Sequence, residues 1–134
     1  MPGPRILVVD DDPDIQDYFG SLLEDNGYQV MPADNTEAAL EMMGEFEPAT
    51  VLIDVMMPGR SGLDLLVTLR NDPRWHALPV VMITGNDKVV QDDCRSYLSA
   101  HGGVRSPDAV LGKPIDQETL LATLARLCPA LDAV

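Results

Sequence analysis

Three consecutive aspartates, Asp10, Asp11 and Asp12, directly follow an apolar run of strand length, Ile6 to Val9. A row of like charges usually forms a solvated turn or begins a helix, so this stretch alone does not define a site. Asp12 precedes Pro13, a pair that is typical of a helix cap and its first turn, and we expect Asp12 to cap a helix. Asp10 and Asp11 are then candidate ligands for a cation, because converging carboxylates repel one another unless one is protonated or a cation joins them.

Three further polar residues, Asp54, Thr84 and Lys113, lie at or just after the ends of later apolar runs. If these runs are parallel strands, their carboxyl ends meet at one edge of a sheet, where sheets of this kind bind their ligands. Carboxylate oxygens favour Mg²⁺ or Ca²⁺ over softer metals. A lysine ammonium and a threonine hydroxyl are suited to contact phosphoryl oxygens. The sequence therefore predicts a site for Mg²⁺ and phosphate at this edge.

Apolar runs alternate with amphipathic stretches of helix length, which predicts a doubly wound α/β fold with a five-stranded parallel sheet and five helices on both of its faces. The runs lack polar alternation, as expected for strands that are covered on both faces. The expected strands are 6–9, 28–31, 50–55, 79–84 and 109–111. The expected helices are the segment between Asp12 and Gly27, the segments 36–46, 63–70 and 87–100, and a last helix that is capped by Asp116 and carries Leu120 to Leu127.

The length of 134 residues predicts a single domain over residues 1–134, with a core at about 5–127. The chain has 46% hydrophobic and 23% charged residues and a net charge of −13, so we expect a globular protein that repels nucleic acid. The sequence contains neither a membrane-spanning apolar run nor a secretory signal, and we expect a cytoplasmic location. Cys94 and Cys128 lack the spacing of zinc ligands.

The segments VVDDD, LIDVMMPGRSG, VVMITG and LGKPI occur in this order. Together they resemble the receiver domain of two-component response regulators, in the CheY-like superfamily. The resemblance runs from about Arg5 to Leu127, which is nearly the whole chain. It implies a flavodoxin-like fold with the strand order 2-1-3-4-5.

The resemblance also implies a function, which is signalling by phosphorylation rather than turnover of a substrate. Such a domain accepts a phosphoryl group from the phosphohistidine of a histidine kinase or of a histidine phosphotransfer protein, and then switches conformation to control an output or a partner. Its only chemistry is the self-catalysed transfer and autodephosphorylation. The implied site residues are Asp10, Asp11, Asp54 and the backbone carbonyl of Met56 for Mg²⁺, and Asp54 as phosphoacceptor with Thr84 and Lys113 for the phosphoryl group.

Two features depart from the pattern of the family. Val110 stands where the family often carries an aromatic residue on the last strand, three positions before the lysine. The coupling between the site and the surface formed by the helix 87–100, the last strand and the last helix can therefore differ from that of the family. The segment between Thr84 and Lys113 is several residues longer than usual. It belongs to a face, formed by the helix 87–100, the last strand and the last helix, that we expect to be a candidate for homodimer contacts.

Two alternative functions remain from the sequence. A Mg²⁺-dependent phosphatase of the haloacid dehalogenase kind also uses an aspartate at a strand end, but it requires a second aspartate two residues later, where this chain has Met56. A pseudo-receiver would signal by protein contact without phosphate. The intact acceptor, acidic pair and lysine disfavour that alternative, whereas Val110 is compatible with it.

Overall fold

Five parallel strands form one sheet, as the alternation of apolar runs predicts. The computed structural model describes residues 3–54, 62–84, 107–112 and 115–127. The order of the strands is β2-β1-β3-β4-β5, and each neighbouring pair is parallel, which confirms the predicted topology. The strands are β1 (Arg5–Val9), β2 (Gln29–Ala33), β3 (Thr50–Asp54), β4 (Val80–Thr84) and β5 (Ala109–Gly112).

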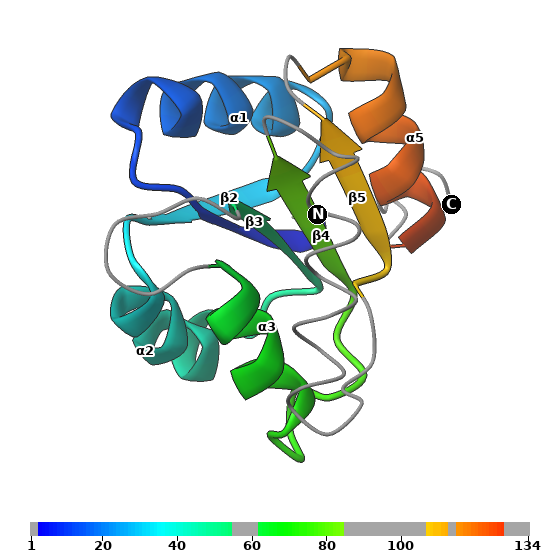
Figure 1. The fold of residues 1–134 in the computed structure, drawn as a ribbon. Coiled ribbons are helices and arrows are strands. Elements are labelled where there is room, and N and C mark those ends of the chain that lie inside the picture. Colours follow the sequence, from blue (N-terminus) through cyan, green and yellow to red (C-terminus); the bar gives the residue numbers. More distant parts are fainter. Residues whose placement is uncertain (1–2, 55–61, 85–106, 113–114, 128–134) are drawn as a thin grey trace.

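Helices cover both faces of this sheet in the described part of the chain (Figure 1). Helices α1 (Pro13–Asp25) and α5 (Gln117–Leu127) lie on one face, and α2 (Thr36–Phe46) and α3 (Gly62–Arg70) lie on the other. The helix expected at 87–100 lies outside the described residues. None of the described helices is long and apolar enough to cross a membrane.

Two apolar clusters, one on each face, hold the strands in place. In β1, Ile6 and Val8 join the cluster beneath α1 and α5, whereas Leu7 and Val9 join the cluster beneath α2 and α3. All four side chains are at most 1% exposed. This alternation explains why β1 is apolar from Ile6 to Val9, and it fixes the carboxyl end of the strand from both sides.

Strand β2 differs from the expected segment 28–31, because it begins at Gln29 and continues through Pro32 to Ala33. Proline lacks the N–H that a central strand must donate, so within sheets it occurs on edge strands, at strand starts or at bulges. Here β2 is the edge of the sheet and pairs only with β1, so its outer side needs no ladder donor. The predicted end of β2 was wrong because it depends on the position of the strand at the edge of the sheet, which is known only from the strand order.

An ion pair between the buried side chain of Arg70 and Asp108, whose side chain is 23% exposed, joins three elements at the amino ends of β4 and β5. The Arg70 side chain, which is 2% exposed, donates to the Leu78 carbonyl at 2.6 Å and to Asp108 Oδ2 at 3.1 Å. The same carboxylate oxygen accepts the Val80 N–H at 2.8 Å. Arg70 thus ties the end of α3 to the starts of both strands, at the end of the sheet opposite the aspartates.

Candidate functional site

Three carboxylates meet at the carboxyl ends of β1 and β3. Val9 pairs with Ile53 across these strands, so the next residues, Asp10 and Asp54, are brought side by side. Asp10 is 2% exposed and Asp54 is 5% exposed, while Asp11 is exposed. One carboxylate oxygen from each of the three aspartates lies within 4.8 Å of the other two. The structure therefore brings together the three acidic residues that the sequence singled out.

The helix cap at Asp12 also orients Asp10. The Asp12 N–H donates to Asp10 Oδ1 at 2.9 Å, and Asp12 Oδ1 accepts the Asp14 N–H at 2.9 Å. Asp12 has an extended backbone, which is typical of a residue that precedes a helix. The predicted cap is confirmed, and its backbone restrains the carboxylate of Asp10.

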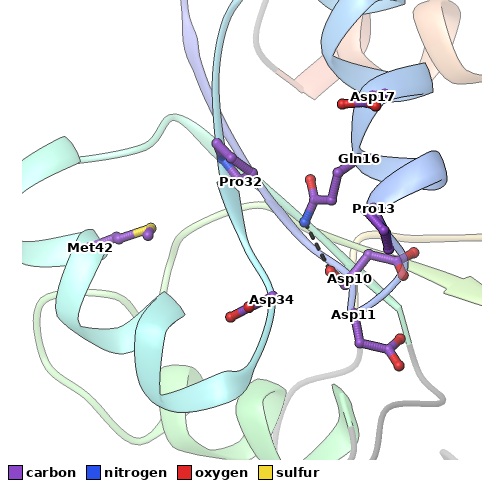
Figure 2. Close-up of a pocket in the computed structure, with 8 residues that line it drawn as sticks. All are labelled: Asp10, Asp11, Pro13, Gln16, Asp17, Pro32, Asp34 and Met42. Carbon is purple, nitrogen blue, oxygen red and sulfur yellow. Dashed lines mark hydrogen bonds between the residues drawn. The ribbon is translucent and has the colours of Figure 1, made fainter.

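Gln16, on the first turn of α1, contacts the same strand ends and was missed by the sequence analysis. Its side-chain Nε2 donates to the carbonyls of Val8, Asp10 and Ala33 at 2.9, 3.0 and 2.9 Å. Figure 2 shows the amide reaching from α1 to Asp10. A signal was present in the sequence, because Gln16 lies three residues before the buried Phe19 and therefore on the inner stripe of the helix.

A cavity of about 570 Å³ opens beside Asp10 and Asp11, between the start of α1 and the strand β2 (Figure 2). Its described lining contains four carboxylates and no lysine or arginine. Negative charge therefore dominates this side of the site and favours cations. The lining residues are Asp10, Asp11, Pro13, Gln16, Asp17, Pro32, Asp34 and Met42.

The other predicted site residues divide into two groups. Thr84 is 1% exposed and ends β4 at the same edge of the sheet, because Asp54 pairs with its neighbour Ile83. Thr84 also pairs with Gly112, the last residue of β5. Lys113 and Met56 lie outside the described residues, so their predicted roles stay predictions.

Residues 6–125 match the family described as the response regulator receiver domain. The chain belongs to this family. The receiver domain is 33% identical over 120 residues to PilH of Pseudomonas aeruginosa, a match that covers 90% of this chain and 93% of PilH. It is 32% identical over 131 residues to RpaA of Synechocystis, a DNA-binding transcriptional regulator, and here the match covers 98% of this chain and 52% of RpaA. The chain thus spans nearly all of PilH but about half of RpaA.

Solved structures support the same assignment. The chemotaxis response regulator CheY4 of Vibrio cholerae superimposes with a TM-score of 0.78 at 27% sequence identity, covering 92% of this chain and 98% of CheY4. A sensor protein from Polaromonas gives a TM-score of 0.80 at 28% identity, covering 92% of this chain and 94% of that protein. The predicted family and fold are confirmed. The chain is a signalling domain of the two-component type, whose response regulators interact with histidine kinases.

Proposed function

We propose that this receiver domain accepts a phosphoryl group on Asp54, in a reaction that depends on Mg²⁺, from the phosphohistidine of a histidine kinase or a histidine phosphotransfer protein. The observation that carries the proposal is the meeting of Asp54 with Asp10 and Asp11, whose oxygens lie within 4.8 Å of one another. Asp54 is 5% exposed and ends a strand that is buried on both faces. Its carboxylate is thus held in one place, as an in-line displacement at phosphorus requires.

The donor set of the site fits Mg²⁺. All three side chains offer oxygen atoms, which hard divalent cations prefer, and their mutual repulsion favours binding of a cation between them. Asp10, Asp11 and Asp54 hold the ion in this proposal, together with the backbone carbonyl of Met56. When bound, Mg²⁺ neutralises the negative oxygens of the phosphoryl group.

The residues of the chain carry the remaining steps. A carboxylate oxygen of Asp54 attacks the phosphorus atom, the bond between phosphorus and the histidine nitrogen breaks, and the electron pair stays on the ring, which leaves as neutral imidazole because its other nitrogen is protonated. At neutral pH the acyl phosphate carries about two negative charges, about one more than the Asp54 carboxylate that it replaces. Lys113 pairs with this new charge, and the hydroxyl of Thr84 donates to a phosphoryl oxygen. The rearrangement of Thr84 is the conformational signal, and hydrolysis of the acyl phosphate by the domain itself ends it.

Further expectations from the sequence remain part of this proposal. They are a single domain over residues 1–134, a cytoplasmic location, homodimer contacts through the face that includes β5 and α5, and the absence of direct contact with nucleic acid. The replacement of the usual aromatic residue by Val110, which is partly buried against the α2 and α3 side of the core, makes altered coupling to that face an expectation as well.

Incubation with acetyl phosphate and Mg²⁺, followed by intact-mass spectrometry, tests the proposal. We expect one added phosphoryl group in the wild type and none in Asp54→Asn or in the presence of EDTA. Asp17→Asn is the matched control, because it removes the same charge from the cavity lining outside the three-aspartate cluster, and it should be phosphorylated like the wild type.

Three results would contradict the proposal. An unchanged mass in the folded wild type at saturating donor would favour the pseudo-receiver, which signals without phosphate. Steady release of phosphate from a generic phosphate ester would instead favour the phosphatase. Phosphorylation of Asp54→Asn at the wild-type rate would show that another residue is the acceptor.

A further inference from the structure

The side chain of Gln16 lies where the β1 and β2 ladder ends. In this last rung, the Asp10 N–H donates to the Ala33 carbonyl at 3.0 Å. The Gln16 amide contacts the same carbonyl at 2.9 Å, and it also reaches the carbonyls of Val8 and Asp10. One side chain of α1 therefore joins the ends of both strands at the last backbone hydrogen bond between them.

The orientation of this amide is defined by its surroundings. Nε2 faces three carbonyl oxygens, and only a donor can satisfy them, so the opposite orientation of the amide would bring oxygen against oxygen. Its Oε1 is shielded from solvent and has no hydrogen-bond partner among the described residues. Burial of an unsatisfied acceptor is unfavourable. The hydrogen bonds that Nε2 donates must therefore offset the cost of burying Oε1 and hold the side chain in this orientation.

We propose that Gln16 is a positioning residue for the metal site. It acts through Asp10, whose carbonyl it holds at 3.0 Å while the Asp12 N–H holds the carboxylate at 2.9 Å. The main chain and the side chain of Asp10 are thereby fixed from two directions before any cation binds. Gln16 itself contacts neither the metal nor the phosphoryl group, and the inference rests on the proposed function of the three aspartates.

The connection between strand and helix makes this restraint effective. Only Asp10, Asp11 and Asp12 separate the end of β1 from the start of α1, so a shift of α1 moves the acidic pair directly. The donations of Gln16 oppose such a shift, because they link α1 to both strands. Loss of this link is expected to spread the positions of the carboxylates and to weaken binding of a cation that requires close, regular coordination.

Isothermal titration with Mg²⁺ of the metal-free, unphosphorylated protein tests the inference. Gln16→Met has nearly the same shape and lacks the donor, and we expect its Kd for Mg²⁺ to rise about tenfold, the low end for residues that orient metal ligands. Gln29→Met is the matched control. Gln29 lies at the opposite end of the same strand pair, where its Nε2 donates to the Gly3 carbonyl at 3.0 Å, and its variant should keep the wild-type Kd.

The Mg²⁺ dependence of phosphorylation is a second measurement. It separates a positioning role of Gln16 from a merely structural role. In Gln16→Met, the Mg²⁺ concentration for half-maximal phosphorylation by acetyl phosphate should rise by the same factor, while the rate at saturating Mg²⁺ stays within about twofold of the wild type. Urea unfolding establishes that each variant is folded. If Gln16→Met does not fold, Gln16→Asn replaces it, because this amide is one methylene too short to reach all three carbonyls and should also weaken Mg²⁺ binding.

Three results would overturn the inference. The first is a wild-type Kd in folded Gln16→Met or Gln16→Asn while the wild type binds Mg²⁺, which leaves the proposed function intact. The second is equal weakening in Gln16→Met and Gln29→Met, which would indicate general loosening of the fold. The third is absence of Mg²⁺ binding to the wild type, which would refute the metal site of the proposed function as well.

Discussion

Replacement of Asp11 by asparagine is expected to stabilise the receiver domain without metal and to lose this advantage when Mg²⁺ is present. Asp11 is exposed, so the substitution removes a charge with little change in packing. Its carboxylate lies within 4.8 Å of an oxygen of Asp10 and of Asp54, two buried groups that cannot move apart. In the absence of a cation the third charge therefore opposes folding.

The magnitude follows from this separation. Two unit charges 4.8 Å apart repel by about 1 kcal/mol at the dielectric constant of water, which is appropriate because Asp11 is exposed. Asp11 has two such neighbours, and salt screens part of the repulsion, so we expect Asp11→Asn to raise the free energy of unfolding by about 1 kcal/mol in EDTA.

Binding of Mg²⁺ at the proposed site removes this advantage of the variant by mass action. At 100 times the wild-type Kd, binding to the folded state alone adds about 2.7 kcal/mol to the wild type. A variant that binds Mg²⁺ tenfold more weakly gains about 1.4 kcal/mol under the same conditions. The difference of about 1.3 kcal/mol cancels the advantage of Asp11→Asn.

Urea unfolding, followed by circular dichroism, measures the free energy of unfolding of the metal-free protein in EDTA and of the protein with Mg²⁺, at constant ionic strength. Asp17→Asn serves as the control, since it removes an exposed charge of the same cavity outside the cluster and should show no comparable dependence on Mg²⁺. A loss of stability of Asp11→Asn in EDTA would refute the reasoning. So would an equal gain with and without Mg²⁺.

Two further predictions concern stability away from the site. Arg70→Met should lower the free energy of unfolding by about 2 kcal/mol, less than for a fully buried pair, because it removes the guanidinium 3.1 Å from an Asp108 side chain that is 23% exposed. Urea midpoints should show part of this loss recovered on addition of Asp108→Asn, and an additive loss would contradict the role of the pair. Hydrogen bonds from the Thr119 hydroxyl and N–H lower the pKa of Asp116 from its ordinary value of 3.8. The charged carboxylate therefore stabilises α5 above pH 3.8, and this contribution is lost as the pH falls through the lowered pKa. The stability of the wild type relative to Asp116→Asn, measured by unfolding in acid, should decline below pH 3.8, and a constant difference would contradict this.

The sequence predicted the acidic cluster because strand ends can be recognised locally. The apolar run before Asp10 and the run that ends at Asp54 each indicate a buried strand, and parallel strands must present their carboxyl ends at one edge. The predicted second helix, 36–46, agrees with α2 at both ends, since Asn35 caps it and Pro48 follows it closely. These features depend on short-range chemistry alone.

Features that depend on distant partners could not be predicted in this way. The extension of β2 through Pro32 requires knowledge that this strand is an edge. Gln16 is one polar residue among several near the start of α1, and its importance is evident only when the ends of β1 and β2 lie beneath it. The roles of Lys113 and Met56, which lie outside the described residues, remain predictions from the resemblance.

The packing of the sheet explains why charge at this site is suited to signalling. Val9 and Ile53, which precede Asp10 and Asp54, are fully buried in the cluster beneath α2 and α3, so the two carboxylates cannot separate without disruption of the core. Carboxylates held this close together favour a cation between them. In the proposed reaction, the acyl phosphate at Asp54 carries about two negative charges in place of one, within the same frame of strands. Since the strand ends are fixed, the proposed mechanism assigns the response to a group at this edge of the sheet, the hydroxyl of Thr84 at the end of β4.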